Sequence, residues 1–160
     1  MILAFKQKLN GKPSYFVEKI WQSLPTKLAL DSNYFIGGLM RKNYKFSDDA
    51  YDMPPKLHTI RKDSSNRWKA GNDIHFTINS RQPNQFQFAP VVKCISVQTI
   101  EIKNIFCDRY CVKINGRKLK KKEVKELAIN DGFKNSDDFW NYFEYSDFQG
   151  KLIHWTDLKY

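Results

Sequence analysis

The spacing of apolar residues changes after Pro54-Pro55, and this change constrains the fold more than any other feature of the chain. Residues 73–79 place Ile74, Phe76 and Ile78 at every second position, and residues 110–114 repeat the pattern. A spacing of two is typical of β-strands that bury one face. The same reasoning predicts further short strands at residues 3–5, 57–61, 86–88, 117–119 and 152–155, and residues 91–102 form a long apolar segment within the strand-rich part of the chain.

Apolar residues at every third or fourth position predict helices at residues 14–24 and 121–130, and a third helix that begins near Ser136. Ser14 and Ser136 are the expected N-caps of the first and third helices. Because helices do not alternate with the strands one by one, the pattern excludes a doubly wound parallel sheet. The predicted fold class is α+β, a small mixed β-barrel with helices packed around it.

The size of the chain predicts one domain. With 160 residues, of which 41% are hydrophobic, it can bury one sizeable core. We therefore expect a single domain over residues 1–160, with an insertion at residues 25–54 that carries one short helix.

No run reaches the roughly 18 apolar residues of a membrane span, and an odd number of cysteines suits a reducing compartment. The expectation is a cytoplasmic protein without a membrane partner.

The charge of the chain is strongly basic. Twenty-seven Lys and Arg against 17 Asp and Glu leave a formal charge of +10, which favours polyanions, nucleic acid first, as partners. The densest cluster holds only one acid, Glu123, among Arg117, Lys118, Lys120, Lys121, Lys122 and Lys125. Two interpretations stay open for this cluster: a solvated helix start, or a surface that contacts phosphates.

No metal or cofactor is expected. Cys107 and Cys111 have a spacing that two zinc ligands can use, but the three histidines are scattered and form no second paired motif. Buried free thiols are the favoured interpretation of the cysteines. The chain also lacks the glycine-rich loops of nucleotide-hydrolysing and dinucleotide-binding proteins.

Two neighbouring segments carry a resemblance to a known family. Residues 54–61 read Pro-Pro-Lys-Leu-His-Thr-Ile-Arg, and residues 68–74 read Trp-Lys-Ala-Gly-Asn-Asp-Ile. This pattern resembles the ASCH domain, a PUA-like β-barrel family. Residues 127–133, 138–140 and 151–155 are similar to the family's later helices and last strand, with Asp131 where the family pattern has glutamate.

The resemblance implies two functions. ASCH and PUA-like barrels are taken as RNA-binding modules with a cleft between barrel and helices that holds a nucleotide or base. One branch of the family resembles an amidohydrolase that removes the acetyl group of N4-acetylcytidine. Its lysine, threonine and acid fall on Lys56, Thr59 and Asp131 of this chain.

The chemistry of these three residues can be judged on its own. A threonine hydroxyl is a nucleophile only when a base takes its proton, and a lysine does so when burial or a nearby cation such as Arg61 lowers its pKa. The alternative role of Arg61 is to bind a phosphate. The structural alternative is a solvated loop lysine, an ordinary strand threonine and the last residue of a helix. His58 alternates with Thr59 and is expected on the other face of its strand.

Further candidate ligand contacts come from exposed turns. Arg67, Trp68 and Lys69 combine a ring with two cations, as base stacking requires, although a tryptophan before a turn glycine also serves as a lid on a barrel end. Arg81 lies at a predicted hairpin tip. The leading hypothesis is therefore an RNA- or nucleotide-binding domain. The alternatives are the amidohydrolase and a protein-interaction domain that uses residues 25–54, and the oligomeric state stays open.

Overall fold

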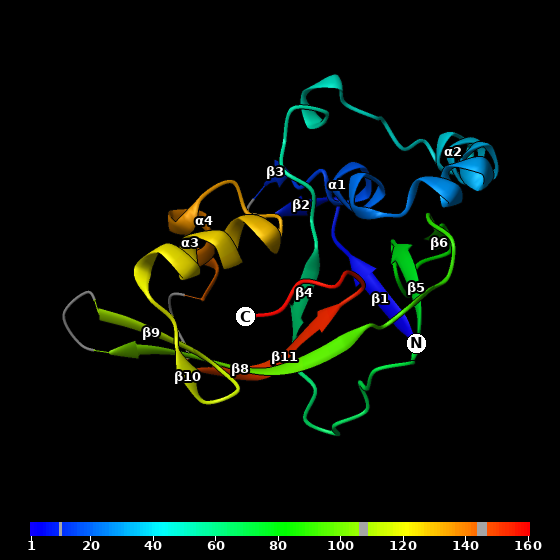
Figure 1. Cartoon of the computed structure of the whole chain (residues 1–160). Helices are drawn as coiled ribbons and strands as arrows, with labels where there is room; N and C mark the ends of the chain where they lie inside the picture. The colour runs from blue at the N-terminus through cyan, green and yellow to red at the C-terminus, as the bar shows by residue number, and fades with distance from the viewer. Residues whose placement is uncertain (10, 106–108, 144–146) are drawn as a thin grey trace. The chain divides into compact units, whose positions relative to one another are not determined.

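The structure is a computed structural model that describes residues 1–9, 11–105, 109–143 and 147–160 (Figure 1). Its chain forms two compact units. Unit 1 comprises residues 1–56 and 72–93, and unit 2 comprises residues 57–71 and 94–160. The chain therefore passes between the units three times, and neither unit is one continuous segment. The expected single domain over 1–160 stays a prediction.

Unit 1 is built around the strand β5 (Asp73–Ile78), which was predicted from its alternating apolar residues. The first strand, β1 (Ile2–Phe5), pairs with β5 in parallel, whereas β6 (Phe86–Gln87) and β7 (Val92–Lys93) pair with it in antiparallel orientation. A small hairpin joins β2 (Lys8–Leu9) to β3 (Lys12–Pro13). The inward side chains form the core of the unit: Leu3, Phe5, Ile74, Phe76, Ile78 and Phe88.

The first helix of unit 1, α1 (Phe16–Ser23), buries Val17 and Ile20 as its spacing predicts. It does not begin as expected, because the N-cap residue is Tyr15 in a left-handed conformation. The hydroxyl of Ser14 donates a hydrogen bond to the carbonyl oxygen of Lys6 at 2.7 Å and accepts one from the backbone N–H of Phe16 at 3.4 Å. Ser14 therefore contacts the first residue of the helix, although it lies one position before the N-cap residue.

Residues 25–54 contain more helix than expected. The 3₁₀ helix η1 (Thr26–Asp31) leads into α2 (Ser32–Arg41), and a second 3₁₀ helix, η2 (Asp48–Ala50), follows. Leu39 is buried, while other apolar side chains of this segment are exposed: Tyr34, Met40, Phe46 and Tyr51. The segment thus packs into unit 1 through one face of α2 and leaves rings on the surface.

The glycine pair of α2 offers a test of this packing. A Cβ atom added at Gly38 would overlap the ring of Phe86, whereas one added at Gly37 would meet only the end of the Arg41 side chain, at 3.5 Å. Gly38→Ala should lower the free energy of unfolding by about 1–3 kcal/mol through overpacking. Gly37→Ala should raise it by about 0.5–1 kcal/mol through helix propensity. Urea unfolding measures both, and effects of the same sign would contradict the packing of α2 on β6.

Unit 2 is built on a five-stranded antiparallel sheet. The strand order is β10 (Arg117–Lys118), β9 (Arg109–Ile114), β8 (Ser96–Ile105), β11 (Phe148–His154) and β4 (His58–Arg61). Positive φ angles of 49° at Asn115 and 81° at Gly116 form the two-residue turn between β9 and β10. The predicted hairpin is confirmed. The apolar run at residues 91–102 does not form one strand, because it divides between β7 in unit 1 and β8 in unit 2.

Two helices lie over one face of this sheet (Figure 1): α3 (Lys121–Asn130) and α4 (Ser136–Phe143). The bounds of α3 match the prediction, and Val124 and Leu127 are buried. At the start of α4 the side chain of Asn135, rather than that of Ser136, accepts the hydrogen bond from the backbone N–H of Asp138, at 2.8 Å. Asn135 therefore caps the helix one position earlier than predicted.

The α+β class is confirmed. Within the described residues the strands form sheets whose pairing runs as open paths, from β10 to β4 in unit 2 and around β5 in unit 1. These pairings do not show the closed barrel that was expected. No helix of the described residues has the length and apolar character to cross a membrane.

Candidate functional site

Asp131 lies at the edge of the sheet of unit 2, beside β4. Its Oδ1 accepts a hydrogen bond from the backbone N–H of Ile60 at 3.1 Å, and the N–H of Leu57 donates to the carbonyl oxygen of Asn130 at 2.8 Å. The end of α3 is thereby fixed against the edge strand β4. The carboxylate of Asp131 accepts a hydrogen bond from the Ile60 N–H, which has no neighbouring strand to pair with on that side in the described part of the sheet. The two motif segments, about 70 residues apart in the sequence, thus meet in unit 2.

His58 extends the site from Asp131 toward a tyrosine. Its Nδ1 lies 3.5 Å from Oδ1 of Asp131, and its Nε2 lies 2.9 Å from the hydroxyl of Tyr160. The amide of Asn130 donates a second hydrogen bond to that hydroxyl, at 2.9 Å. Burial raises the pKa of the Tyr160 hydroxyl, so the phenol stays protonated at neutral pH. The carboxylate of Asp131, the imidazole of His58 and the phenol of Tyr160 therefore lie in a row, each next to the following one.

His154 lies directly across from His58 in the pairing of β11 with β4, and the two ring centroids are 5.2 Å apart. Burial lowers the pKa of His154 to about 3, with His58 and Lys159 acting in the same direction and Asp131 opposing them. The ring is therefore neutral at pH 7. Neither of its nitrogens has a hydrogen-bond partner among the described residues.

Sequence reasoning placed His58 on the far face of its strand and did not select His154 or Tyr160. His58 does alternate with Thr59, but both side chains are buried, and the face of His58 is the one that meets His154 and Tyr160. The pairing of His58 with His154 depends on strand register. No local pattern encodes a register between strands that are nearly 100 residues apart.

Arg61, at the end of β4, is half-buried. Burial lowers the pKa of its guanidinium, and the nearby charge of Asp131 acts against that shift. An arginine keeps its charge even so, because its ordinary pKa lies far above neutrality. Arg61 therefore adds a fixed cation near Asp131. The predicted effect of Arg61 on Lys56 stays a prediction.

Lys56 belongs to unit 1, whereas Thr59 and Asp131 belong to unit 2. Its side chain is 1% exposed, so the solvated-loop alternative for this lysine is wrong. The Nζ atom lies 4.8 Å from the ring centroid of Phe16 and 5.9 Å from that of Phe5, within the range of cation–π attraction. The backbone N–H of Lys56 donates to the carbonyl oxygen of Lys19 at 3.0 Å.

The cations of residues 117–125 lie on the surface of unit 2. We call Lys120, Lys121 and Lys122 the helix-start lysines; all three are exposed at the beginning of α3. Glu123 is already engaged, since its Oε1 lies 2.8 Å from Nη1 of Arg117 and its Oε2 accepts the N–H of Lys120 at 2.7 Å. These hydrogen bonds hold the pKa of Glu123 below its usual value.

The turn that contains Trp68 differs from the stacking hypothesis. Trp68 is 7% exposed, and its backbone N–H donates to Asp63 at 2.9 Å. A base cannot stack on a buried ring, so the burial of Trp68 contradicts the stacking hypothesis for this residue. The interpretation as a lid on a barrel end stays a prediction. The flanking Arg67 and Lys69 are exposed in unit 2, and Arg81 is exposed in unit 1 with a φ of 64°.

The cysteines do not assemble with other ligands in the part of the chain that is described. Cys94 and Cys111 are buried free thiols, and Cys107 lies outside the described residues. Burial raises the pKa of the Cys94 thiol. Among the residues that the structure describes, no group of three or more His, Cys, Asp or Glu side chains could hold a metal ion.

Comparisons with protein-family models, with curated proteins and with solved structures find no significant match to this chain.

Proposed function

We propose that this protein is an RNA- or nucleotide-binding domain of the ASCH type, and that phosphates contact the helix-start lysines. The observation that carries the proposal is the placement of these exposed cations at the beginning of α3. The formal charge of +10 and the resemblance of residues 54–74 to ASCH domains support it. The small β-barrel implied by that resemblance is part of the same proposal.

The position of the helix-start lysines has an energetic cost that binding would explain. The N-terminus of a helix carries a partial positive charge, so cations there are unfavourable by a few tenths of a kcal/mol each. Adjacent lysines also repel one another. Glu123 is engaged by Arg117 and by the N–H of Lys120. Among the described residues, the one ion pair of a helix-start lysine is the exposed pair of Lys122 with Glu126, at 3.9 Å. An external anion such as phosphate would relieve this repulsion and complete the helix N-terminus.

The test is the salt dependence of RNA binding. Changing the three helix-start lysines to glutamine should weaken binding and reduce the slope of log K against log salt by about 0.7–0.9 for each lost phosphate contact. A control variant, Lys27→Gln with Lys62→Gln and Lys134→Gln, removes the same charge from other exposed positions. Stability should stay within about 0.5 kcal/mol in both variants. An unchanged slope in the helix-start variant would show that the cluster is only a solvated surface.

The amidohydrolase stays a second candidate because Lys56, Thr59 and Asp131 are all buried. Burial is the condition under which a lysine amine can lose its proton and accept the proton of a threonine hydroxyl. The threonine oxygen would then attack the acetyl carbonyl carbon, the amine of cytosine would leave with a proton, and water would release acetate from the threonine. Asp131 would orient the lysine or the leaving amine.

Incubation of the purified protein with N4-acetylcytidine, across about pH 6–9, tests this candidate. Lys56→Ala and Thr59→Ala should each remove most of any turnover, and the double variant should lose little more, because the two residues act as a unit. Asp131→Asn should cost less if the carboxylate orients rather than transfers a proton. Absence of turnover by the wild-type protein at high enzyme concentration would remove the hydrolase and leave the RNA-binding proposal in place.

A further inference from the structure

The sheet of unit 2 has two different faces. Cross-strand pairs such as Ile100 with Ile114 and Ile102 with Val112 are buried on the face over which α3 and α4 lie (Figure 1). Side chains alternate along a strand, so their neighbours in sequence point to the other face. On that face the strands β8 to β11 carry mostly polar and charged residues.

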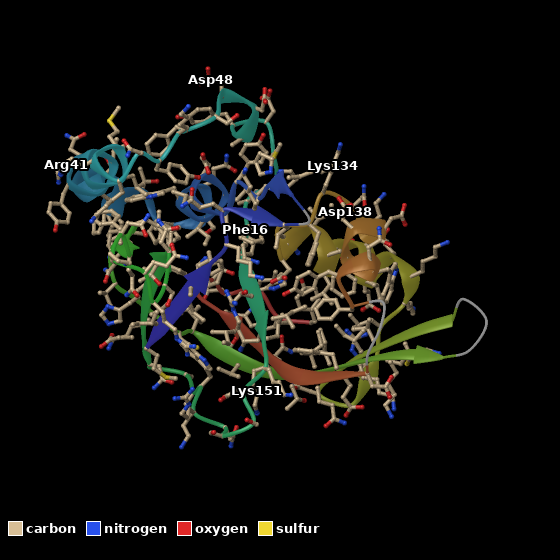
Figure 2. The ribbon with its side chains drawn as sticks, turned by 180° about the vertical axis from the view of Figure 1, so that it is seen from behind. Phe16, Arg41, Asp48, Lys134, Asp138 and Lys151 are labelled. Atoms are coloured by element: carbon tan, nitrogen blue, oxygen red, sulfur yellow. The ribbon has the colours of Figure 1, made fainter. Side chains whose placement is uncertain are left out.

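Four lysines of this other face form what we call the lysine face: Lys103 on β8, Lys113 on β9, Lys118 on β10 and Lys151 on β11. Lys103 and Lys118 are exposed, and Lys113 and Lys151 are half-buried. In Figure 2, Lys151 lies on the side of the sheet away from Lys134 and Asp138, the residues labelled around the start of α4. The lysine face is thus a solvent-accessible surface of unit 2.

The register shows that the lysine face is not neutralised by its own sheet. Lys118 lies directly across from Lys113, and like charges in that position repel. Glu101, across from Lys113 on the other side, is the one acid among the described residues of these strands on this face. Lys151 lies across from Thr99, and Glu101 lies across from Gln149, both exposed and uncharged. A local excess of positive charge therefore remains.

Among the side chains that the structure describes, the lysine face has no exposed aromatic ring. Binding of single strands relies on aromatic rings on which bases stack. The exposed aromatic residue of unit 2 in the described part of the chain is Tyr142, which belongs to α4 on the opposite face. The other exposed rings, Tyr34, Phe46 and Tyr51, belong to unit 1. The lysine face offers cations without stacking platforms.

The dimensions of the lysine face suit phosphates that are spread in two directions. Neighbouring strands are about 4.8 Å apart, so the three strand spacings from Lys118 on β10 to Lys151 on β11 correspond to about 14 Å across the sheet. Lys103 extends the array along β8. A duplex presents two phosphate rows on either side of a groove, and proteins recognise double-stranded RNA largely through such backbone contacts.

We propose that the lysine face binds the phosphate backbone of double-stranded RNA. This inference rests on the proposed function and assigns it a surface and a class of nucleic acid, since Lys118 leads within two residues to the helix-start lysines. The contacts are to phosphates, so binding is independent of base sequence and strongly dependent on salt.

The experiment compares two RNA probes: a mixed-sequence duplex of 20 base pairs and an oligouridylate of 40 nucleotides, which carries a similar number of phosphates without pairing. The lysine-face variant combines Lys103→Gln, Lys113→Gln and Lys151→Gln. At about 0.1 M salt it should bind the duplex at least about 10-fold more weakly, with a salt slope reduced by about 2–3. Its affinity for oligouridylate should fall less. The control variant at Lys27, Lys62 and Lys134 should change duplex affinity by less than about 3-fold.

A second variant protects the test against misfolding of the first. Gln149→Glu adds one negative charge at an exposed position across from Glu101, and it should also weaken duplex binding without changing the melting temperature by more than a few degrees. If the lysine-face variant folds and binds the duplex as the control variant does, the inference is overturned while the proposed function stands. A larger loss for oligouridylate than for the duplex also overturns it. If the wild-type protein binds neither probe, the proposed function fails as well.

Discussion

Unfolding of this protein is expected to require about 2–3 kcal/mol less free energy at about pH 4.5 than at pH 6.5, because His154 is buried as a neutral imidazole. In the unfolded chain His154 takes up a proton as the pH falls through its ordinary pKa of 6.5. In the folded protein the ring stays neutral until about pH 3. The stability is therefore fully present above pH 6.5 and is lost progressively as the pH falls from 6.5 toward 3.

The variant His154→Phe isolates this effect. Phenylalanine cannot take up a proton, so the free energy of unfolding of the variant should depend less on pH. Between pH 6 and pH 4.5 its slope should be smaller than that of the wild type by about 1.4 kcal/mol for each pH unit. At pH 8 it should be close to the wild type or more stable, since it removes two buried nitrogens that have no hydrogen-bond partner among the described residues. Urea unfolding at several pH values measures both. The control is His75→Gln, whose ring is partly exposed to water in unit 1. A wild-type pH dependence that persists in His154→Phe would contradict the assignment.

Asp131→Ala is expected to lower the free energy of unfolding by about 2–4 kcal/mol. The change removes the acceptor of the Ile60 N–H, a negative charge near Arg61, and the oxygen 3.5 Å from Nδ1 of His58. The Ile60 N–H, the Arg61 guanidinium and the His58 imidazole would each lose an interaction with Asp131. Denaturant unfolding measures the loss, and amide hydrogen exchange at Ile60 should accelerate.

Asp131→Asn is the matched control. Its amide oxygen can still accept the Ile60 N–H, while the negative charge is absent, so it should cost about 1–2 kcal/mol less than alanine. If both variants lose the same stability, the hydrogen bond contributes little and the charge near Arg61 is the larger contribution. Full stability of Asp131→Ala would show that the end of α3 does not depend on the carboxylate.

The parts of the fold that could be predicted are those encoded locally. The alternation in residues 73–79, the Asn115-Gly116 turn and the spacing within residues 121–130 each concern a few neighbouring residues, and β5, the β9–β10 hairpin and α3 follow them. The first residues of the helices were harder to predict. Asn135 and Ser136 are both good caps, and only the backbone geometry selects Asn135.

The parts that could not be predicted depend on contacts between distant segments. The division of residues 91–102 between two units, and the parallel pairing of β1 with β5, have no local signature. In the site, Asp131 was selected only through its resemblance to a motif. His154 and Tyr160 were missed because register, not composition, brings them to His58.

The three passages of the chain between the units have a consequence for synthesis on the ribosome. β1 is made about 70 residues before its partner β5, and unit 1 is complete only when β7 has emerged. Closing so large a loop lowers the entropy of the chain before the strand pairing lowers its free energy, and this slows folding. Until then the apolar strand Ile2–Phe5 has an unpaired edge that can associate with other chains. The nascent protein is therefore expected to depend on chaperones most before β7 has emerged from the ribosome.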